Sequence, residues 1–209
     1  MKKSTKNEEI LAVNIRNIRS YLKTDFWPIK GHTNLDGIII STSVYKERAD
    51  IENNNKYKQI IPYCIIVEQF SEKVYLYERS VTKVYNEERL RGRFSIGLGG
   101  HVREKWLNGV NPVIAAMRRE LLEEVGLRGF DWIYAGFVNN EDDEVGQVHL
   151  GCVFIIEPDK TGMTEINPDK KEVVSGGFKS ISEIRAPDVY DQLERWSQIL
   201  VDNWDSVIK

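Results

Sequence analysis

The chain has 209 residues, which suits one domain with an extension. Its 29 Lys and Arg against 32 Asp and Glu give a net charge of -3, which predicts no general attraction to nucleic acids or anionic membranes. The charged start is not followed by a continuous apolar segment, so we expect neither a signal peptide nor a membrane span. Two cysteines, Cys64 and Cys152, lie in apolar runs, which indicates buried, reduced thiols and a cytoplasmic location.

The first half of the chain contains several short apolar segments. In Glu9–Leu22 the apolar residues fit both an alternating strand and a helical stripe, so we predict a short strand followed by a helix. Loops are expected at Phe26–Pro28 and at residues 53–55. The segments Gln59–Glu68 and Lys73–Arg79 are rich in β-branched and aromatic residues, which predicts a β-hairpin.

Arginines lie on the approach to a glycine-rich turn, Gly97–Gly100. Arg79 ends the second predicted strand, and Arg93 and Phe94 precede the turn, so all three are candidates for substrate binding. Surface side chains at strand ends explain the same pattern equally well. The glycines of the turn would allow positive φ and a close backbone approach.

A helix with two unlike faces follows an inserted polar segment. We predict that it begins at Pro112 with Asn111 as its N-cap, and that it ends at Gly126 as a left-handed C-cap. An apolar stripe at helical spacing indicates the face that packs on the core: Ile114, Met117, Leu121 and Val125.

The other face of this helix carries three acids, Glu120, Glu123 and Glu124, at the spacing i, i+3, i+4. Like charges at this spacing repel one another, so the cluster needs screening by solvent or a bound cation. Mg²⁺ fits best, because it takes oxygen ligands and keeps waters for a phosphate substrate. Arg119 stands one turn before Glu123 and is placed to hold that carboxylate. A solvated helix face is the structural alternative.

Beyond the helix we predict strands at Trp132–Val138 and Gln147–Ile156, on either side of an acidic loop at residues 140–144. The last predicted element is one amphipathic helix over Val189–Asn203 that packs on the sheet.

The run Arg119–Leu127, Arg-Glu-Leu-Leu-Glu-Glu-Val-Gly-Leu, resembles the second half of the Nudix box, G-x5-E-x7-R-E-U-x-E-E-x-G-U with U aliphatic, and matches every specified position of that half. Gly99–Val102 is similar to the glycine turn at which the box begins. Between Gly100 and Arg119 the chain has five more residues than the pattern, and Asn111 takes the place of its first glutamate. The chain thus resembles the MutT-like Nudix hydrolases, with an insertion in the first half of the box.

This resemblance implies an α/β fold, a Nudix-type α/β/α sandwich with a mixed β-sheet. We expect residues 59–209 to form the Nudix-like domain and residues 1–58 to form an N-terminal extension packed on it. The implied activity is metal-dependent hydrolysis of a diphosphate linkage in a nucleoside diphosphate joined to a group X. The implied partner is a small nucleotide-type substrate, and homodimers are frequent in this family.

The resemblance also implies roles for individual residues. The backbone carbonyl of Gly100 and the three box acids, Glu120, Glu123 and Glu124, would hold Mg²⁺ or Mn²⁺. Arg119 would brace the acids, and a box carboxylate or Glu172 would act as the base. The missing first glutamate favours an alternative, a nucleotide-binding or regulatory module without hydrolysis. An isomerase of the isopentenyl diphosphate type shares the fold, but the two cysteines have no neighbouring signature for it.

Overall fold

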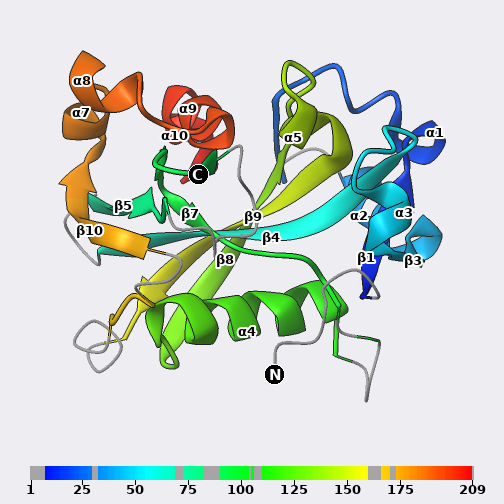
Figure 1. The fold of residues 1–209 in the computed structure, drawn as a ribbon, viewed down its shortest axis with the longest axis horizontal. Helices are drawn as coiled ribbons and strands as arrows, with labels where there is room; N and C mark the ends of the chain where they lie inside the picture. The colour runs from blue at the N-terminus through cyan, green and yellow to red at the C-terminus, as the bar shows by residue number, and fades with distance from the viewer. Residues whose placement is uncertain are drawn as a thin grey trace.

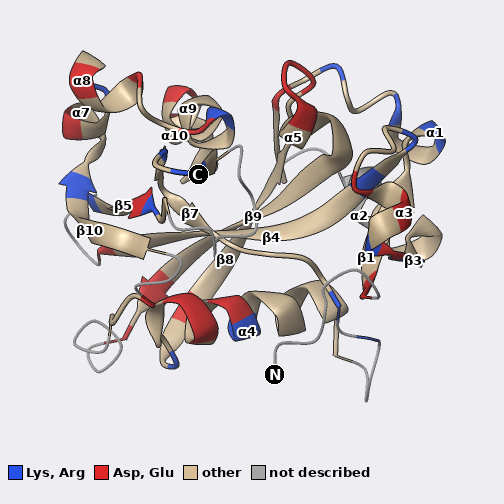
Figure 2. Ribbon diagram, in the orientation of Figure 1, with Lys and Arg blue, Asp and Glu red and all other residues tan. Residues whose placement is uncertain are grey.

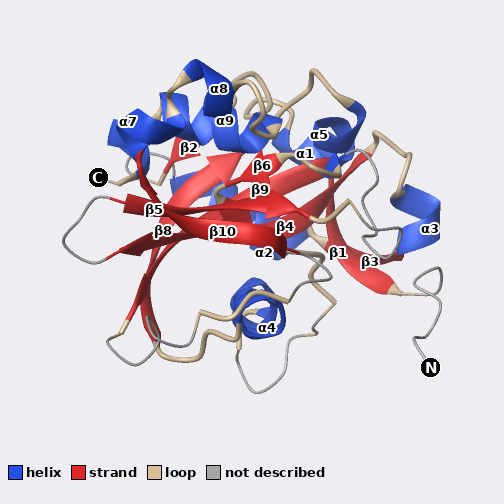
Figure 3. Cartoon of the chain, turned by 60° about the vertical axis from the view of Figure 1, so that its left-hand side comes forward, coloured by secondary structure: helices blue, strands red, loops and turns tan. Residues whose placement is uncertain are grey.

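The computed structural model describes residues 8–29, 33–68, 73–81, 90–103, 105, 110–159, 166–169 and 173–208. For residues 33–36 it describes the backbone alone. A mixed β-sheet lies between two helical layers. Helix α4 (Pro112–Val125) covers one face, and α5 (Glu144–Val148), α7 (Ile181–Ile184) and α9 (Arg195–Asp202) lie on the other (Figures 1 and 3). The predicted α/β/α sandwich with a mixed sheet is therefore confirmed.

Ten strands of the described part of the chain form one sheet. Its main path runs β10 (Val173–Ser180), β5 (Lys73–Arg79), β4 (Tyr57–Glu68), β9 (His149–Pro158), β8 (Phe130–Val138) and β2 (Phe26–Pro28). The long strand β4 also pairs with β1 (Glu9–Asn14) and β7 (Gly97–Leu98), while β3 (Val44–Glu47) pairs with β1 and β6 (Phe94–Ser95) with β5. The β4–β9 pair is parallel and the others are antiparallel.

Successive residues of β4 belong to different cores, because side chains alternate between the two faces of a strand. Cys64 and Ile66 belong to the cluster that contains the buried stripe of α4. Tyr63 and Ile65 belong to the cluster under the C-terminal helices. Both cysteines are buried and neither forms a disulfide, as predicted.

The N-terminal region contributes strands to the same sheet. The predicted strand and helix of Glu9–Leu22 are confirmed as β1 and α1 (Ile15–Ile18). The loop predicted at Phe26–Pro28 is wrong, because these residues form β2 along β8, with Phe26 buried. Proline is tolerated there because β2 lies at the end of the main strand path. The helices α2 (Thr33–Thr42) and α3 (Arg48–Ile51) are further elements of this region.

Both predicted ends of α4 are confirmed. The side chain of Asn111 accepts a 2.9 Å hydrogen bond from the backbone N–H of Val113, and Gly126 adopts the left-handed conformation with φ 73°. The stripe of Met117, Leu121 and Val125 is fully buried, while Ile114 is partly buried. The chain therefore fixes this helix by its own local signals.

The C-terminal segment differs from the prediction of one helix over Val189–Asn203. It forms α8 (Pro187–Tyr190), then α9, then α10 (Trp204–Val207). The break has a cause in the sheet: Phe94 donates its N–H to the carbonyl of Gln192, and its own carbonyl accepts from the N–H of Glu194. A continuous helix cannot offer these groups to a strand. Within the described ranges, no helix has both the length and the apolar character that crossing a membrane requires.

Candidate functional site

The three acids of α4 differ in their exposure to solvent. Glu120 is only 8% exposed, Glu123 is exposed, and Glu124 lies between these extremes. Acidic and basic residues gather on the C-terminal half of the helix (Figure 2). The acid face predicted from helical spacing is therefore partly buried, because Glu120 lies under the glycine turn.

Arg119 contacts two of these acids through one nitrogen. Its Nη1 donates to Oε1 of Glu120 at 2.5 Å and to Oε2 of Glu123 at 3.2 Å. The contact with Glu123 agrees with the i, i+4 spacing, and the contact with Glu120 adds a second partner. Arg103 of the inserted segment also donates to Glu123, with Nη2 3.4 Å from Oε2.

The glycine turn reaches this cluster at Gly100. A Cβ atom added to Gly100 would overlap the carboxylate of Glu120, so only glycine allows this close approach. At Gly99 a Cβ would overlap the backbone carbonyl of Pro62. Positive φ, the other predicted reason for these glycines, is absent from Gly97, Gly99 and Gly100. The turn needs glycine for proximity, not for a left-handed backbone.

Burial and charge set the protonation of Glu120 and of its neighbours. Burial raises the pKa of the Glu120 carboxyl above its ordinary value, and the charge of Glu123 adds to this, while Arg119 lowers it. Burial also raises the pKa of the Cys64 thiol well above its ordinary value, and the charges of Glu124 and Glu120 act in the same direction. Cys64 is therefore a neutral thiol in the core that contains the buried stripe of α4.

The donor set suits a hard divalent cation. Within the described ranges, no group of three or more His, Cys, Asp or Glu side chains is arranged to hold a metal ion by itself. Mg²⁺, however, commonly uses one or two carboxylates together with waters and substrate phosphates. Glu120 supplies one such carboxylate, and the backbone of Gly100 lies so close that an added Cβ would overlap it. Whether Glu123 and Glu124 join it stays a prediction.

The predicted substrate-binding residues lie away from this cluster. Arg79 is buried, and its guanidinium forms a two-pronged ion pair with Glu194, with Nε at 3.0 Å from Oε2 and Nη2 at 3.1 Å from Oε1. Phe94 packs in the core under the C-terminal helices, and Arg93 donates to the backbone carbonyl of Asp191 at 3.3 Å. This arrangement favours a structural role for Arg79 over the predicted phosphate contact.

Glu172, the candidate base outside the box, lies outside the described residues, so its position stays a prediction. Its neighbour Val173 begins β10 opposite Arg79 and is buried in the core that includes α4. The backbone of Asp169 donates to the carbonyl of Glu124 at 2.7 Å, which brings the segment before Glu172 to the end of α4.

Several polar residues near the cluster were not among the site residues predicted from the sequence. His101 donates from Nε2 to Oε1 of Gln59 at 2.7 Å, and Nε2 of His149 lies 3.4 Å from the same nitrogen. Burial lowers the pKa of His101 well below its ordinary value, and His149 and nearby arginines lower it further. A histidine directly after the glycine turn was the one available hint; Gln59 and His149 meet it only through pairing of β4 with β9.

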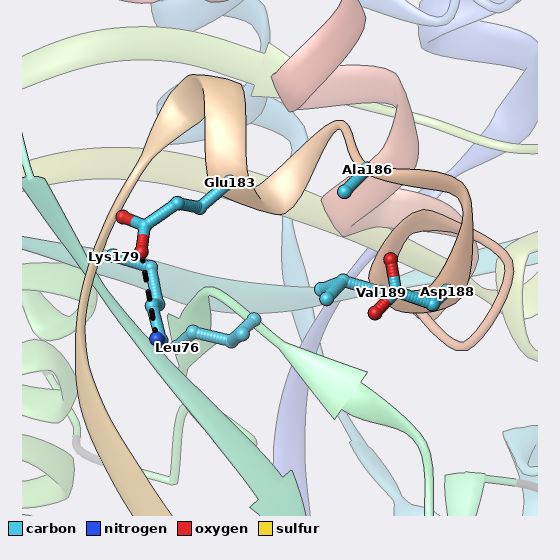
Figure 4. Close-up of a pocket in the computed structure, with 6 residues that line it drawn as sticks. All are labelled: Leu76, Lys179, Glu183, Ala186, Asp188 and Val189. Atoms are coloured by element: carbon cyan, nitrogen blue, oxygen red, sulfur yellow. Dashed lines mark ion pairs between the residues drawn. The ribbon is translucent and has the colours of Figure 1, made fainter.

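A shallow groove lies at the other edge of the molecule, between β5, β10 and the helices α7 and α8 (Figure 4). An ion pair of 3.5 Å between Lys179 and Glu183 spans part of it. The groove contains none of the predicted site residues; it is lined by Leu76, Lys179, Glu183, Ala186, Asp188 and Val189.

Comparisons with known proteins agree with this arrangement, although no protein-family model matches the chain. Protein YmaB of Bacillus subtilis (strain 168) is 31% identical over 169 residues, which cover 77% of this chain and 78% of that protein. The crystal structure of Tm1382, provisionally named a Nudix hydrolase, matches with a TM-score of 0.72 at 23% identity and covers 94% of this chain and 98% of its own. A mutT/nudix family protein of Listeria innocua matches with a TM-score of 0.50 at 17% identity, covering 72% of this chain and 93% of its own. These structural likenesses show the Nudix fold.

Proposed function

Because the chain belongs to the same family as Protein YmaB and has the Nudix fold, we propose that it is a metal-dependent hydrolase of a diphosphate linkage. The substrate class is a nucleoside diphosphate joined to another group X. One observation carries the proposal: the backbone at Gly100 lies against the carboxylate of Glu120, to which Arg119 donates a hydrogen bond. A carboxylate in contact with a glycine turn is costly to bury unless a cation or a charged partner uses it.

The residues proposed to hold Mg²⁺ or Mn²⁺ are Glu120, Glu123 and Glu124 with the main-chain carbonyl of Gly100. When bound, the cation would neutralise the charge that water attack places on the phosphoryl oxygens. Arg119 keeps Glu120 and Glu123 in fixed orientations through Nη1. A carboxylate of the box, or Glu172, takes the proton from the attacking water.

The test is release of phosphate-containing products from dinucleotides, nucleotide sugars and nucleoside triphosphates, with Mg²⁺, with Mn²⁺ and with a chelator. Glu124→Gln is expected to lower turnover by roughly 100-fold or more, because it removes one proposed ligand charge from the site. Glu47→Gln is the matched control, since Glu47 is an exposed acid on β3. Near-normal rates in Glu124→Gln would overturn the assignment of the box acids.

A second candidate is a nucleotide-binding module without hydrolysis, and the position of Asn111 favours it. This residue stands where the Nudix pattern has its first glutamate, and its side chain is used to cap α4. No cleavage across the panel, together with a nucleotide that raises the melting temperature, would support binding alone.

Reduced thiols at Cys64 and Cys152 support the proposal of a cytoplasmic location, where thiols stay reduced. The predicted homodimer and the boundary between an extension of residues 1–58 and the domain of residues 59–209 stay predictions. Sedimentation of the purified chain would decide the first. The second needs expression of residues 59–209 alone. We expect this shorter chain to be less stable, because it lacks β1, which pairs with β4 at Gln59.

A further inference from the structure

Three polar side chains outside the acid cluster form a connected group, in which Gln59 and His149 are buried and His101 is partly buried. Gln59 and His149 are direct partners in the parallel pairing of β4 with β9, so their side chains share one face of the sheet. Gln59 is fully buried and His149 is 5% exposed. Tyr63 and Val153 have the same strand parity and belong to the core under the C-terminal helices, so this is the face opposite α4.

The proton positions in this group follow from two carbonyl groups. Nδ1 of His149 lies 2.7 Å from the backbone oxygen of Val145. A carbonyl oxygen only accepts hydrogen bonds, so this Nδ1 carries a proton, and in the neutral imidazole Nε2 of His149 then offers a lone pair.

The amide of Gln59 fixes the second ring in the same way. Its Nε2 donates to the backbone oxygen of Ile51 at 3.3 Å, which turns Oε1 toward His101. Because Oε1 accepts, Nε2 of His101 must carry the proton in their 2.7 Å hydrogen bond. Nε2 of His101 also lies 3.4 Å from the unprotonated Nε2 of His149, so its N–H faces two acceptors that hold the ring.

The main chain of His101 is in turn tied to the acid cluster. Its carbonyl oxygen accepts a 2.9 Å hydrogen bond from Nη2 of Arg119, whose Nη1 donates to Glu120. The preceding residue, Gly100, is the one whose Cβ would overlap Glu120. A continuous set of contacts therefore crosses the sheet from Val145 to Glu120.

We propose that Gln59 and His149 are positioning residues that hold the His101 ring and so place the Gly100–His101 main chain against Arg119 and Glu120. This inference rests on the proposed function, which it extends to two residues outside the box. Partners that orient the ligands of a metal site commonly change metal affinity or activity by roughly 10–100-fold when they are removed. A purely structural role would change stability alone.

The first test is nuclear magnetic resonance of the imidazole nitrogens of the full chain, with His32→Gln and His149→Gln used to assign its three histidines. We expect the Nε2–H form for His101 and the Nδ1–H form for His149. Opposite proton positions, or rings that exchange freely between the two forms, would overturn the proposal that Gln59 and His149 hold the His101 ring.

The second test compares Gln59→Met with Val153→Ala. The first substitution keeps the length of the side chain and removes the acceptor for His101. The second creates a small cavity on β9, four residues beyond His149 and on the same face, without touching a polar group. Gln59→Met is expected to shift the nuclear magnetic resonance signal of the Arg119 guanidinium. It should also weaken Mn²⁺ binding and lower kcat, each by roughly 10-fold.

Val153→Ala is expected to lower the melting temperature and to leave the Arg119 signal, Mn²⁺ binding and kcat unchanged. Equal effects of the two variants on Arg119 and on kcat would refute the positioning role. If the wild-type chain cleaves nothing in the substrate panel, the hydrolase proposal fails by itself. The Arg119 signal in Gln59→Met then still decides whether Gln59 controls the acid cluster.

Discussion

The carbonyl oxygen of His101 accepts a 2.9 Å hydrogen bond from Nη2 of Arg119, which joins the glycine turn to α4. The other terminal nitrogen of the same guanidinium contacts Glu120 and Glu123. A guanidinium is planar and presents its donors in fixed directions, so one side chain sets the relative position of the turn and two acids. An ammonium group cannot reproduce this pattern.

Arg119→Lys is therefore expected to lower turnover by roughly 10–100-fold, because the acids lose their common donor. Positive charge is retained, so the free energy of unfolding should change by only about 1 kcal/mol. Steady-state rates and urea unfolding measure the two effects. Arg118→Lys is the matched control, since Arg118 is exposed and lies over the ring of Phe130. The same loss of rate in both variants would contradict a special role for Arg119.

Gly100→Ala should disturb the site through sterics alone. The new methyl group would overlap the Glu120 carboxylate, so either the turn or the acid must move. We expect a loss of about 1–3 kcal/mol of stability from this overpacking and a loss of metal-dependent activity. Gly177→Ala on β10 is the control, because a Cβ there meets no atom within 4 Å. Urea unfolding and Mn²⁺ titration would reveal the difference, and unchanged Mn²⁺ affinity in Gly100→Ala would refute the predicted role of this backbone.

Helix α4 could be predicted from the sequence because its signals are local. Asn111, Pro112 and Gly126 define its ends within the segment itself, and the apolar stripe defines its buried face. The hairpin of β4 and β5 is predicted for the same reason, since its strands are neighbours in the chain. In these cases sequence pattern and tertiary structure require the same conformation.

Three of the failures involve partners that are distant in sequence. Phe26 belongs to a strand only because β8, more than a hundred residues later, offers it an edge. The C-terminal helix breaks because the segment before α9 hydrogen-bonds to Phe94. Likewise, spacing on α4 places Glu120 on a polar face, but the approach of Gly100 buries it. No local periodicity carries such information.

The ion pair of Arg79 with Glu194 allows a direct test of whether Arg79 stabilises the fold or binds substrate. Arg79→Met would leave Glu194 buried without its partner, in contact with Ser95 and Tyr63, and should cost about 3–5 kcal/mol of stability. Arg79→Met combined with Glu194→Met removes both charges and should recover most of this loss. Urea unfolding compares the three proteins.

The double variant also answers the question of substrate contact. If Arg79 serves the fold, the recovered protein should keep a KM close to that of the wild type. A KM raised by roughly 10-fold or more in a stable double variant would instead restore the predicted contact with phosphate.

Lys58 is fully buried, with Nζ 2.6 Å from the backbone oxygen of Gly146 and 2.5 Å from Oε1 of Glu141. Burial lowers its pKa below the ordinary value of 10.5, although Glu141 and Asp143 oppose this. Between the lowered pKa of the folded state and 10.5, the unfolded chain binds more protons than the folded one. The contribution of Lys58 to the free energy of unfolding should therefore increase as pH rises through this window.

Lys58→Met removes this pH dependence while it fills a similar volume. Other lysines and tyrosines titrate in the same range, but they do so in both proteins, so the difference between wild type and variant isolates Lys58. Urea unfolding at pH 7, 8, 9 and 10 should show the stability of the wild type rising relative to Lys58→Met. Parallel stability curves would mean that the ion pair with Glu141 fully offsets the cost of burial, and the direction of the pKa shift argued for Lys58 would be wrong.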